Sequence, residues 1–564
     1  MITSETTQEE LTPPDSRTDA LLLRAPLLVR ISSHVAVWVT VLVSLGVELA
    51  HGWRPVGDNA AIASRAFQTL SSHPPVVGML STAGGTGHTV YDPGPLLFWL
   101  LAVPVRLDHT HGALWGAALL AGAVLSLAIE AVWSTRLWPG CAVIAFAVVD
   151  MFWLTPSVFE NISWNAYFPI PFLIATLALA WVVGTGSFGW WPALVVTASV
   201  AAQTHLLFSI PCTLLALTAP AIGLVIAGRP RRLRWLWIGV GVAIVCWIAP
   251  ILQQLFAKTG NVSALFGSQS GQPKLGVSFA LTLLGRMGGP SPIWIVHQPT
   301  TYFSVVDFET AATSTGGAII LGLLVATALW GWVTRRRRLS ASAGIGLVAS
   351  AGIVTAFAIF PTAQGIDLYY LFNLLWPLGV LVWATLLWGL ATVVVDLIRR
   401  WSGPTPRATI DANIATTLPA QWQVIAALLS VGVITIMCIL GIQGLSGFTP
   451  TEATVSWDTF DVASVTNISR AIEHAVPTGT VKFSVSNGPG SITTIVWIAE
   501  GVGWQLAADG WTPGLNPVEA NYTGLRVPDG TDYTAVHVTM KGSQVVALTT
   551  THCRTGAANC GPSG

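Results

Sequence analysis

The chain has 564 residues, of which 52% are hydrophobic and only 9% are charged, and its formal net charge at pH 7 is zero. Soluble domains carry about a quarter of their residues as charges, so a soluble globule of this size is excluded. The balanced charge gives no sign of a nucleic-acid partner. Long apolar runs instead predict a polytopic membrane protein.

The N-terminal segment, residues 1–33, is expected to be a disordered cytoplasmic tail. Its first 23 residues are polar and acidic and lack the basic-then-apolar order of a cleaved secretion signal. A shorter apolar run at 94–106 predicts a re-entrant or interfacial helix. Eleven longer runs predict transmembrane helices at about 34–51, 112–134, 138–155, 166–184, 190–208, 210–228, 235–252, 317–334, 342–360, 371–396 and 422–444.

The basic residues predict how these helices are oriented. With the N-terminus in the cytoplasm, most arginines before the C-terminal part lie in short inner segments, as the positive-inside rule requires. The run of four arginines at 335–338 is the strongest marker. An odd number of crossings then places the C-terminus outside. The inner clusters are Arg17, Arg24 and Arg30; Arg136; Arg229, Arg231, Arg232 and Arg234; 335–338; and Arg399, Arg400 and Arg407.

Two long outer loops, 52–111 and 253–316, interrupt the predicted transmembrane domain, which covers 34–447. Residues 448–564 predict a small extracytoplasmic α/β or α+β domain with a helix at 465–476, a strand at 480–486 and a hairpin at 531–550. Cys553 and Cys560 lie in its polar tail, where a disulfide requires an oxidising compartment. Their position agrees with a C-terminus outside the cell.

Polar side chains gather on the outer side of this topology, which points to chemistry at the outer leaflet. Ionisable residues at membrane depth are costly and are functional candidates by default. A transporter would place such groups at mid-membrane in broken helices of paired repeats, and we find no such repeat. The outer candidates include Asp58, Arg65, His88, Asp92, Glu160, Asn165, His205, Lys258, Tyr369 and Tyr370.

The first outer loop resembles a known family. "GDNAAIASRAFQTL" at 57–70, followed by "VYDPGPLLFWLLAVP" at 90–104, resembles the glycosyltransferase superfamily that uses polyprenyl-phosphate sugars (the GT-C type). The closest branch looks like the protein O-mannosyltransferase and lipid A aminoarabinose transferase family. Weaker likenesses lie in "AAQTHLLFSIPCTLLAL", "CWIAPILQQ" and "DLYYLFNLLWPLGVL", so the resemblance covers about 34–396. Actinobacterial cell-wall arabinosyl- and mannosyltransferases belong to the same wider superfamily.

Two departures from the family pattern stand out. The second acid of the family's acidic pair is Asn59 here. The lysine before the family's double proline is Pro93, and the first proline is Gly94. Donor-phosphate contacts are therefore expected elsewhere, or the donor class differs from the mannosyl and aminoarabinosyl cases.

Asp58 is the predicted catalytic residue, since it matches the first acid of the family's pair. Glycosyl transfer to a hydroxyl needs a base, and a partly desolvated carboxylate can take the acceptor's proton. Its charge also favours an oxocarbenium-like transition state. The structural alternative is that Asp58 only caps a helix beginning near Ala60.

Other outer polar residues are expected to bind substrate, alongside Asn59. Arg65 lies two helical turns after Asp58 and suits phosphate, with Arg286 and Lys258 as competitors and an interfacial role as the alternative. His205 is a candidate for binding the donor phosphate or sugar, and the alternative is a hydrogen-bonded residue inside the helix bundle. Glu160 and Asn165 suit sugar hydroxyls, with Trp164 or Tyr167 stacking on the ring. Asp92 is either a site acid or a turn former, and Tyr369 either a site or an interface residue.

No metal ligand is assigned, because no His/Asp spacing is diagnostic. A divalent metal held by Asp92 with His88, His205 or Glu160 stays open. No cytosolic nucleotide-binding motif is found, which favours a lipid-linked donor.

The sequence therefore predicts a multi-pass enzyme of a bacterial plasma membrane. It would move a sugar from a polyprenyl-phosphate donor to a hydroxyl of a cell-envelope glycan, lipid or protein, with an inverted anomeric centre. The rivals are a transporter or flippase of lipid-linked sugars, and a non-enzymatic envelope assembly protein.

Overall fold

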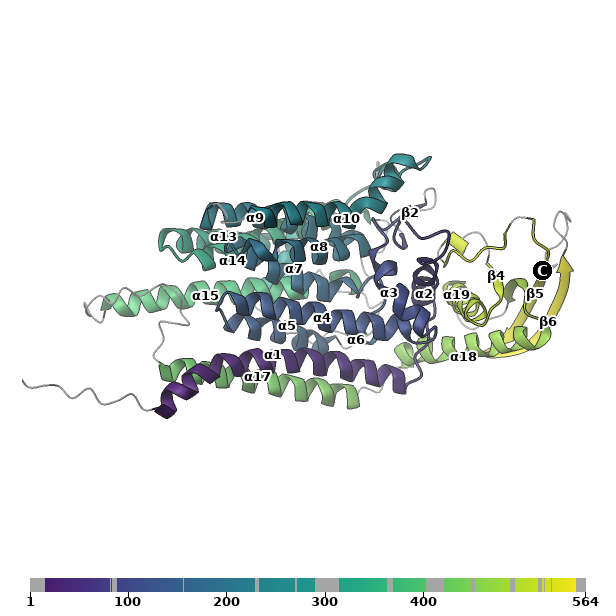
Figure 1. The fold of residues 1–564 in the computed structure, drawn as a ribbon, viewed down its shortest axis with the longest axis horizontal. Helices are drawn as coiled ribbons and strands as arrows, with labels where there is room; N and C mark the ends of the chain where they lie inside the picture. Colours follow the sequence, from purple (N-terminus) through teal and green to yellow (C-terminus); the bar gives the residue numbers. More distant parts are fainter. Residues whose placement is uncertain are drawn as a thin grey trace, which may run out of the picture.

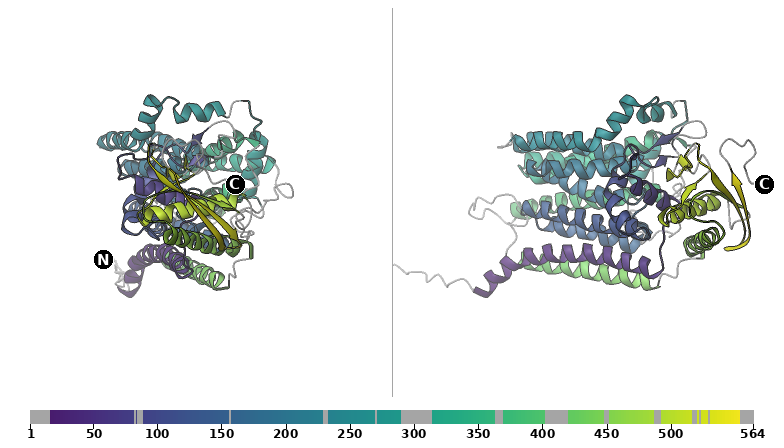
Figure 2. Two further views of the ribbon diagram at one scale, coloured as in Figure 1. Left: turned by 90° about the vertical axis from the view of Figure 1, so that its right-hand side faces the viewer. Right: turned by 45° about the vertical axis from the view of Figure 1, so that its right-hand side comes forward.

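The apolar runs of the sequence form long helices that lie side by side, as Figure 1 shows for the computed structural model. A smaller domain with a β-sheet lies at one end of this bundle (Figure 1 and Figure 2). The structure describes residues 16–81, 83, 89–155, 157–228, 233–268, 271–289, 314–362, 369–401, 420–447, 452–486, 492–515, 520–521, 523–528 and 530–553.

Eight of the described helices are long and apolar enough to cross a membrane. The chain is therefore a helical membrane protein by length and composition. These helices are α1 (Ser16–Ala50), α4 (Gly112–Ser134), α9 (Leu206–Ala227), α10 (Arg234–Phe256), α13 (Ser314–Val333), α14 (Arg337–Ala358), α15 (Leu375–Trp401) and α17 (Ala420–Gly447).

Three shorter helices complete the described bundle: α5 (Pro139–Leu154), α7 (Pro169–Gly184) and α8 (Trp191–Thr204). All eleven predicted transmembrane segments are thus helical, except that the segment at 190–208 is interrupted at His205, where α8 ends and α9 begins. The number that cross the membrane stays a prediction. The disordered tail predicted up to residue 33 is wrong for residues 16–33, because α1 begins at Ser16. Its Ala- and Leu-rich sequence favours helix, and Arg30 binds another helix.

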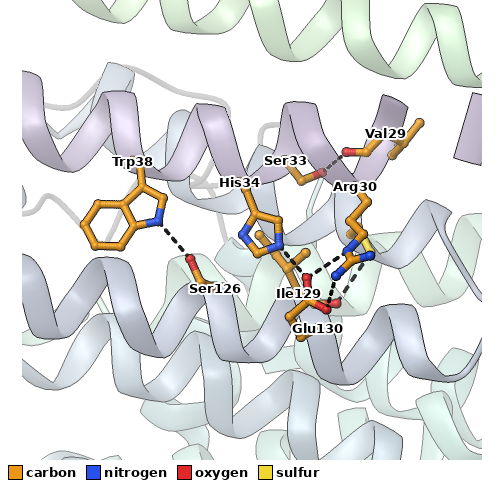
Figure 3. Close-up of polar contacts among 9 residues, drawn as sticks. Val29, Arg30, Ser33, His34, Trp38, Ser126, Ile129 and Glu130 are labelled. Carbon is orange, nitrogen blue, oxygen red and sulfur yellow. Dashed lines mark hydrogen bonds and ion pairs between the residues drawn. The ribbon is translucent and has the colours of Figure 1, made fainter. Parts of the chain in front are cut away.

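A partly exposed polar cluster joins α1 to α4, as Figure 3 shows. Arg30 donates two hydrogen bonds to Glu130, of 2.8 and 2.6 Å, and His34 lies 2.7 Å from the same carboxylate. A second pair joins Arg336 to Asp396 of α15. Charges among membrane helices are tolerated when they pair in this way.

Short elements cover the bundle at the end that carries the C-terminal domain. Strands β1 and β2 pair antiparallel, with Leu80 opposite Tyr91 and Ser81 opposite Val90. The predicted helix at 94–106 is confirmed as α3. These elements are α2 (Asp58–Gln68), β1 (Leu80–Ser81), β2 (Val90–Tyr91), α3 (Leu96–Leu107), α6 (Ser157–Glu160), α11 (Asn261–Ser268) and η4 (Tyr369–Phe372). Two further elements pack on the bundle itself: η2 (Phe188–Trp190) joins α7 to α8, and α12 (Gly276–Gly288) lies against α13 and α14.

The C-terminal domain consists of α18 (Glu452–Ala475), β3 (Thr480–Ser486), α19 (Ile492–Ala508), β4 (Thr512–Gly514), β5 (Tyr533–Lys541) and β6 (Gln544–Cys553). The strand order is β4-β3-β5-β6, with β3 parallel to both neighbours and β5 antiparallel to β6. The predicted strand at 480–486 and the hairpin are confirmed, whereas α19 was not predicted. Cys553 is disulfide-bonded, and its expected partner Cys560 lies outside the described residues.

Candidate active site

Asp58 is the first residue of α2, at the end of the bundle under the C-terminal domain. Its Oδ2 accepts a 2.7 Å hydrogen bond from the indole nitrogen of Trp164. Its Oδ1 has no hydrogen-bond partner among the residues that the structure describes. Burial raises the pKa of Asp58, and the Trp164 bond partly offsets this. The residue is therefore a desolvated carboxyl with one oriented and one open oxygen.

The structural alternative for Asp58, that it caps a helix beginning near Ala60, is wrong. The helix begins at Asp58 itself, and Gly57 occupies the capping position without any side-chain bond. The positive φ of 56° at Gly57 turns the chain into the helix. Asp58 is thus free to point at the loop that carries Trp164.

Asp92 is a second buried carboxyl, and only 3% of it is exposed. Its Oδ2 accepts a 3.2 Å bond from Asn165 Nδ2, and its Oδ1 accepts a 3.1 Å bond from the backbone nitrogen of Leu206. Burial raises the pKa of Asp92 to about 8, and the charge of Asp58 adds to this rise. At neutral pH Asp92 is therefore mostly protonated.

Two further segments hold Asp92 in place. Its backbone bonds to Met79 and Gly78, which extends the β1–β2 pairing. Just before it, both backbone groups of Tyr91 bond to the side-chain amide of Asn261 at 2.9 Å. Asp92 is thus fixed by long-range contacts, and the turn-forming role considered for it does not account for its side-chain bonds.

His205 separates α8 from α9 and lies next to Asp92, since the following Leu206 nitrogen donates to that carboxyl. The His205 backbone is extended, and its Nδ1 accepts a 3.3 Å bond from Leu207 nitrogen. Burial lowers the pKa of His205 to about 4, so the ring is neutral at pH 7. Its proton then lies on Nε2, and His205 can offer a ligand a hydrogen bond but no positive charge.

Arg65, predicted to bind the donor phosphate, contacts the C-terminal domain. Its Nη2 donates a 2.6 Å bond to the backbone oxygen of Asn521, and Ser64 and Gln68 bond to the backbone oxygen of Thr523. This face of α2 is therefore covered by the C-terminal domain. The structure gives Arg65 a role in docking that domain.

The other predicted residues fall into two groups. Asn59 follows Asp58, and its Oδ1 accepts a 2.8 Å bond from Ser163. Because an amide does not ionise, this position supplies no second acid. Asn165 donates a hydrogen bond to Asp92. His88 lies outside the described residues, as do the side chains of Glu160 and Tyr369.

Aromatic rings form one wall of the site. The Trp164 ring centroid is 4.9 Å from that of Tyr370 and 5.0 Å from that of Tyr167. Tyr167 is fully buried, which removes it as a platform for a sugar ring. Trp164 is partly exposed and remains the candidate.

Gly94 is closely packed, and this excludes the proline that the resembling family has at the matching position. A Cβ on Gly94 would lie 2.1 Å from Oε1 of Gln203 and 2.8 Å from Cγ of Pro250. The Gly94 nitrogen also bonds to the Gln203 backbone oxygen at 3.3 Å. A proline does not fit this position, because the segment after Asp92 passes so close to α8 and α10.

Sequence reasoning missed two buried amides near these segments. Gln203 and Asn373 are completely buried, and Oε1 of Gln203 and both amide atoms of Asn373 have no hydrogen-bond partner among the described residues. Buried polar groups usually have partners. Neither residue stood out in the sequence, because each is an isolated amide in an apolar run.

The described residues include no group of three or more His, Cys, Asp or Glu side chains arranged to hold a metal ion. The described site therefore has two carboxyls, one amide on the second of them and a neutral imidazole. This set suits proton transfer and hydrogen bonding to hydroxyl or phosphate oxygens.

No protein-family model matches the chain, and no curated protein matches it.

Proposed function

We propose that the protein is an integral membrane glycosyltransferase that moves a sugar from a polyprenyl-phosphate donor to a hydroxyl of a cell-envelope acceptor. The observation that carries this proposal is the desolvated carboxyl of Asp58, oriented by Trp164 and open at Oδ1. A base needs to face the proton that it removes.

In the proposed reaction, Asp58 Oδ1 takes the proton of the acceptor hydroxyl. The acceptor oxygen forms a bond to the anomeric carbon while the bond from that carbon to the phosphate oxygen breaks. The electron pair of this bond leaves with the polyprenyl phosphate. Direct displacement inverts the anomeric centre.

Asp92 has the complementary role in this proposal. A buried carboxyl whose pKa is raised can stay protonated beside a second carboxyl that acts as the base. Protonated Asp92 adds no second negative charge beside the donor phosphate. Neutral His205 and Asn165 flank it and would bind donor oxygens by hydrogen bonds.

The setting supports an active site on the outer face of a bacterial plasma membrane. The site lies at the end of the bundle that carries the C-terminal domain. Arg136 after α4, Arg234 at the start of α10 and Arg335 before α14 lie at the other end. By the positive-inside rule the arginine-rich end is cytoplasmic. The C-terminal domain would then be extracytoplasmic and would cover the site from outside.

The reaction can be tested without knowing the sugar, because every donor releases the same polyprenyl phosphate. Membranes containing the full-length protein are incubated with a panel of polyprenyl-phosphate sugars and envelope acceptors, and lipid phosphate release is measured. A transporter or flippase would move the donor across sealed vesicles without releasing it. Movement without release would overturn the proposal.

A further inference from the structure

Helix α11 has its large apolar side chains on its exposed face and its polar anchoring side chains on its buried face. Val262 and Phe266 lie one turn apart and are 44% and 73% exposed. Asn261 and Ser268 lie two turns apart on the other side and are only 6% and 4% exposed. A surface helix of a protein in water has the opposite arrangement. The exposed face of α11 therefore suits an apolar environment.

The buried face of α11 is fixed to the segment that precedes α3. Asn261 exchanges two hydrogen bonds of 2.9 Å with the backbone nitrogen and oxygen of Tyr91. Ser268 Oγ donates a 3.3 Å bond to the backbone oxygen of Ala83. Because these bonds hold the polar side inward, the apolar side of the helix is directed away from the protein.

Two glutamines at the end of α10 fix the start of α11. Gln253 Oε1 accepts a 2.9 Å bond from the backbone nitrogen of Asn261. Gln254 Oε1 accepts a 3.0 Å bond from the backbone nitrogen of Val262, and its Nε2 donates a 2.7 Å bond to Ser263 Oγ. These bonds engage amide groups that the first turn of a helix leaves unpaired. The orientation of α11 relative to α10 is therefore set by side chains of the protein itself.

The exposed apolar surface of α11 continues that of α10. Only 17% of the most apolar stretch of α10 is buried within the protein. Leu252 and Leu255 carry its exposed surface to the end of the helix, where Phe256 is 80% exposed. The exposed Lys258 follows in the turn before α11, and a lysine at such a position can extend its charged group to the lipid headgroups. Apolar surface thus runs from a helix long enough to span the membrane onto α11.

The length of α10 places α11 at the edge of the hydrocarbon layer. The helix has 23 residues and is about 35 Å long at the rise of an α-helix, whereas the hydrocarbon core of a bilayer is about 30 Å thick. With Arg234 at one boundary, Phe256 reaches the other, at the end of the bundle that carries the C-terminal domain (Figure 1). Helix α11 follows at this level and lies against β2.

We propose that α11 and the end of α10 form an anchor in the membrane leaflet nearest to the C-terminal domain. The anchor lies at the boundary between headgroups and acyl chains, and phospholipid is its occupant. Val262 and Phe266 insert among the acyl chains, and Lys258 lies among the phosphates. Interfacial helices bind membranes through an apolar face of this kind.

The anchor also connects the lipid surface to the candidate site. Tyr91, which Asn261 holds by both backbone groups, directly precedes Asp92. The position of the Asp92 segment is therefore tied to the membrane through α11. The membrane anchor does not depend on the proposed glycosyl transfer, because its evidence lies in α10 and α11 alone.

The test measures which medium surrounds Phe266. The full-length variant Phe266→Cys carries a fluorescent label and is reconstituted into phosphatidylcholine vesicles. Cys246 and Cys438 are replaced by alanine in all samples, because these free cysteines are only half-buried. We expect a lipid with a nitroxide near its headgroup to quench most of the fluorescence, and iodide in the water to quench little of it.

Two matched positions calibrate the measurement. Val245→Cys labels the centre of α10, where the side chain is 68% exposed, and a nitroxide at the end of the acyl chain is expected to quench it best. Val546→Cys labels β6 of the C-terminal domain, where the side chain is 57% exposed, and only iodide is expected to quench it. Quenching at Phe266→Cys that follows the Val546→Cys pattern would contradict the anchor, because the α11 face would then lie in water.

A second measurement separates lipid from a protein partner such as another copy of this chain. The photoreactive amino acid p-benzoylphenylalanine is placed at position 266 or, as the control, at position 546, and the membranes are irradiated. Mass spectrometry is expected to find phospholipid attached at position 266 and none at position 546. Cross-linked dimers of the chain without lipid adducts at position 266 would overturn the proposal.

Discussion

The indole nitrogen of Trp164 donates a 2.7 Å hydrogen bond to Oδ2 of Asp58, across 106 positions of the sequence. This bond orients the carboxyl and leaves Oδ1 open. It also opposes the rise in the pKa of Asp58 that burial causes. Trp164 is therefore a positioning residue for the proposed base.

Trp164→Phe tests this relationship, because it keeps an aromatic ring beside Tyr370 and removes only the donor. A hydrogen bond to a charged group contributes about 1.5–3 kcal/mol. Without it the pKa of Asp58 is expected to rise, and the acidic limb of the pH–rate profile to move up by about one pH unit or more. The profile of polyprenyl phosphate release against pH measures this. An unmoved limb, with Trp153→Phe as the matched control, would show that Trp164 does not tune Asp58.

Asp92→Asn tests the role of the second carboxyl. Burial and the charge of Asp58 raise the pKa of Asp92 to about 8, so Asp92 is neutral below that pH, and asparagine is its neutral counterpart. The variant is expected to keep its activity at pH 7 and to lose the fall in rate that wild type shows above about pH 8. Wild type falls there because ionised Asp92 repels the donor phosphate. A variant that is inactive at pH 7 while folded would show that Asp92 acts as an ionised group.

His205→Gln tests the buried imidazole through stability. The pKa of His205 is lowered to about 4 in the folded protein, below the ordinary value of about 6.5. The unfolded chain therefore binds the extra proton first, and wild-type stability falls as the pH drops from about 6.5 to 4. The variant loses this part of the pH dependence, as thermal unfolding across that range will show. His73→Gln, at an exposed histidine, is the control and keeps the wild-type dependence.

Gly57→Ala tests the contact between the start of α2 and the C-terminal domain. A Cβ at Gly57 would lie 2.9 Å from Cγ of Trp497, and the Gly57 nitrogen bonds to the Trp497 backbone oxygen. Gly52 has a similar positive φ but nothing within 4 Å of its Cβ position, so Gly52→Ala carries only the backbone strain. We expect Gly57→Ala to cost about 1–3 kcal/mol more than Gly52→Ala and to expose the C-terminal domain to limited proteolysis. Equal protection of the two variants would contradict a close contact at Trp497.

The helices were predictable, because long apolar runs leave the chain few other structures. That Asp58, Asp92, Asn165 and His205 lie close together was only partly predictable from the sequence. Their common side followed from the topology, but the bonds between them depend on how α2, the β1–β2 pair and the α8–α9 turn pack together. Sequence spacing carries no information about such contacts.

Arg65 illustrates the limit most clearly. Its spacing of seven residues from Asp58 correctly gave helical periodicity within α2. The sequence did not show that the C-terminal domain covers this helix, because α19 and the segment around Asn521 were not predicted to reach it. Arg65, which the sequence suggested would be open to a ligand, instead binds the C-terminal domain.

The most direct test of the account is the release of polyprenyl phosphate by the purified full-length protein with Asp58→Asn. Asp108→Asn is the matched control, since Asp108 lies in the same loop and its Oδ1 accepts bonds from Thr110 and His111 that asparagine can preserve. Loss of a general base costs about 100- to 10,000-fold. We expect a loss in that range for Asp58→Asn and wild-type release for Asp108→Asn. A folded Asp58→Asn protein that releases polyprenyl phosphate at the wild-type rate would contradict the central claim.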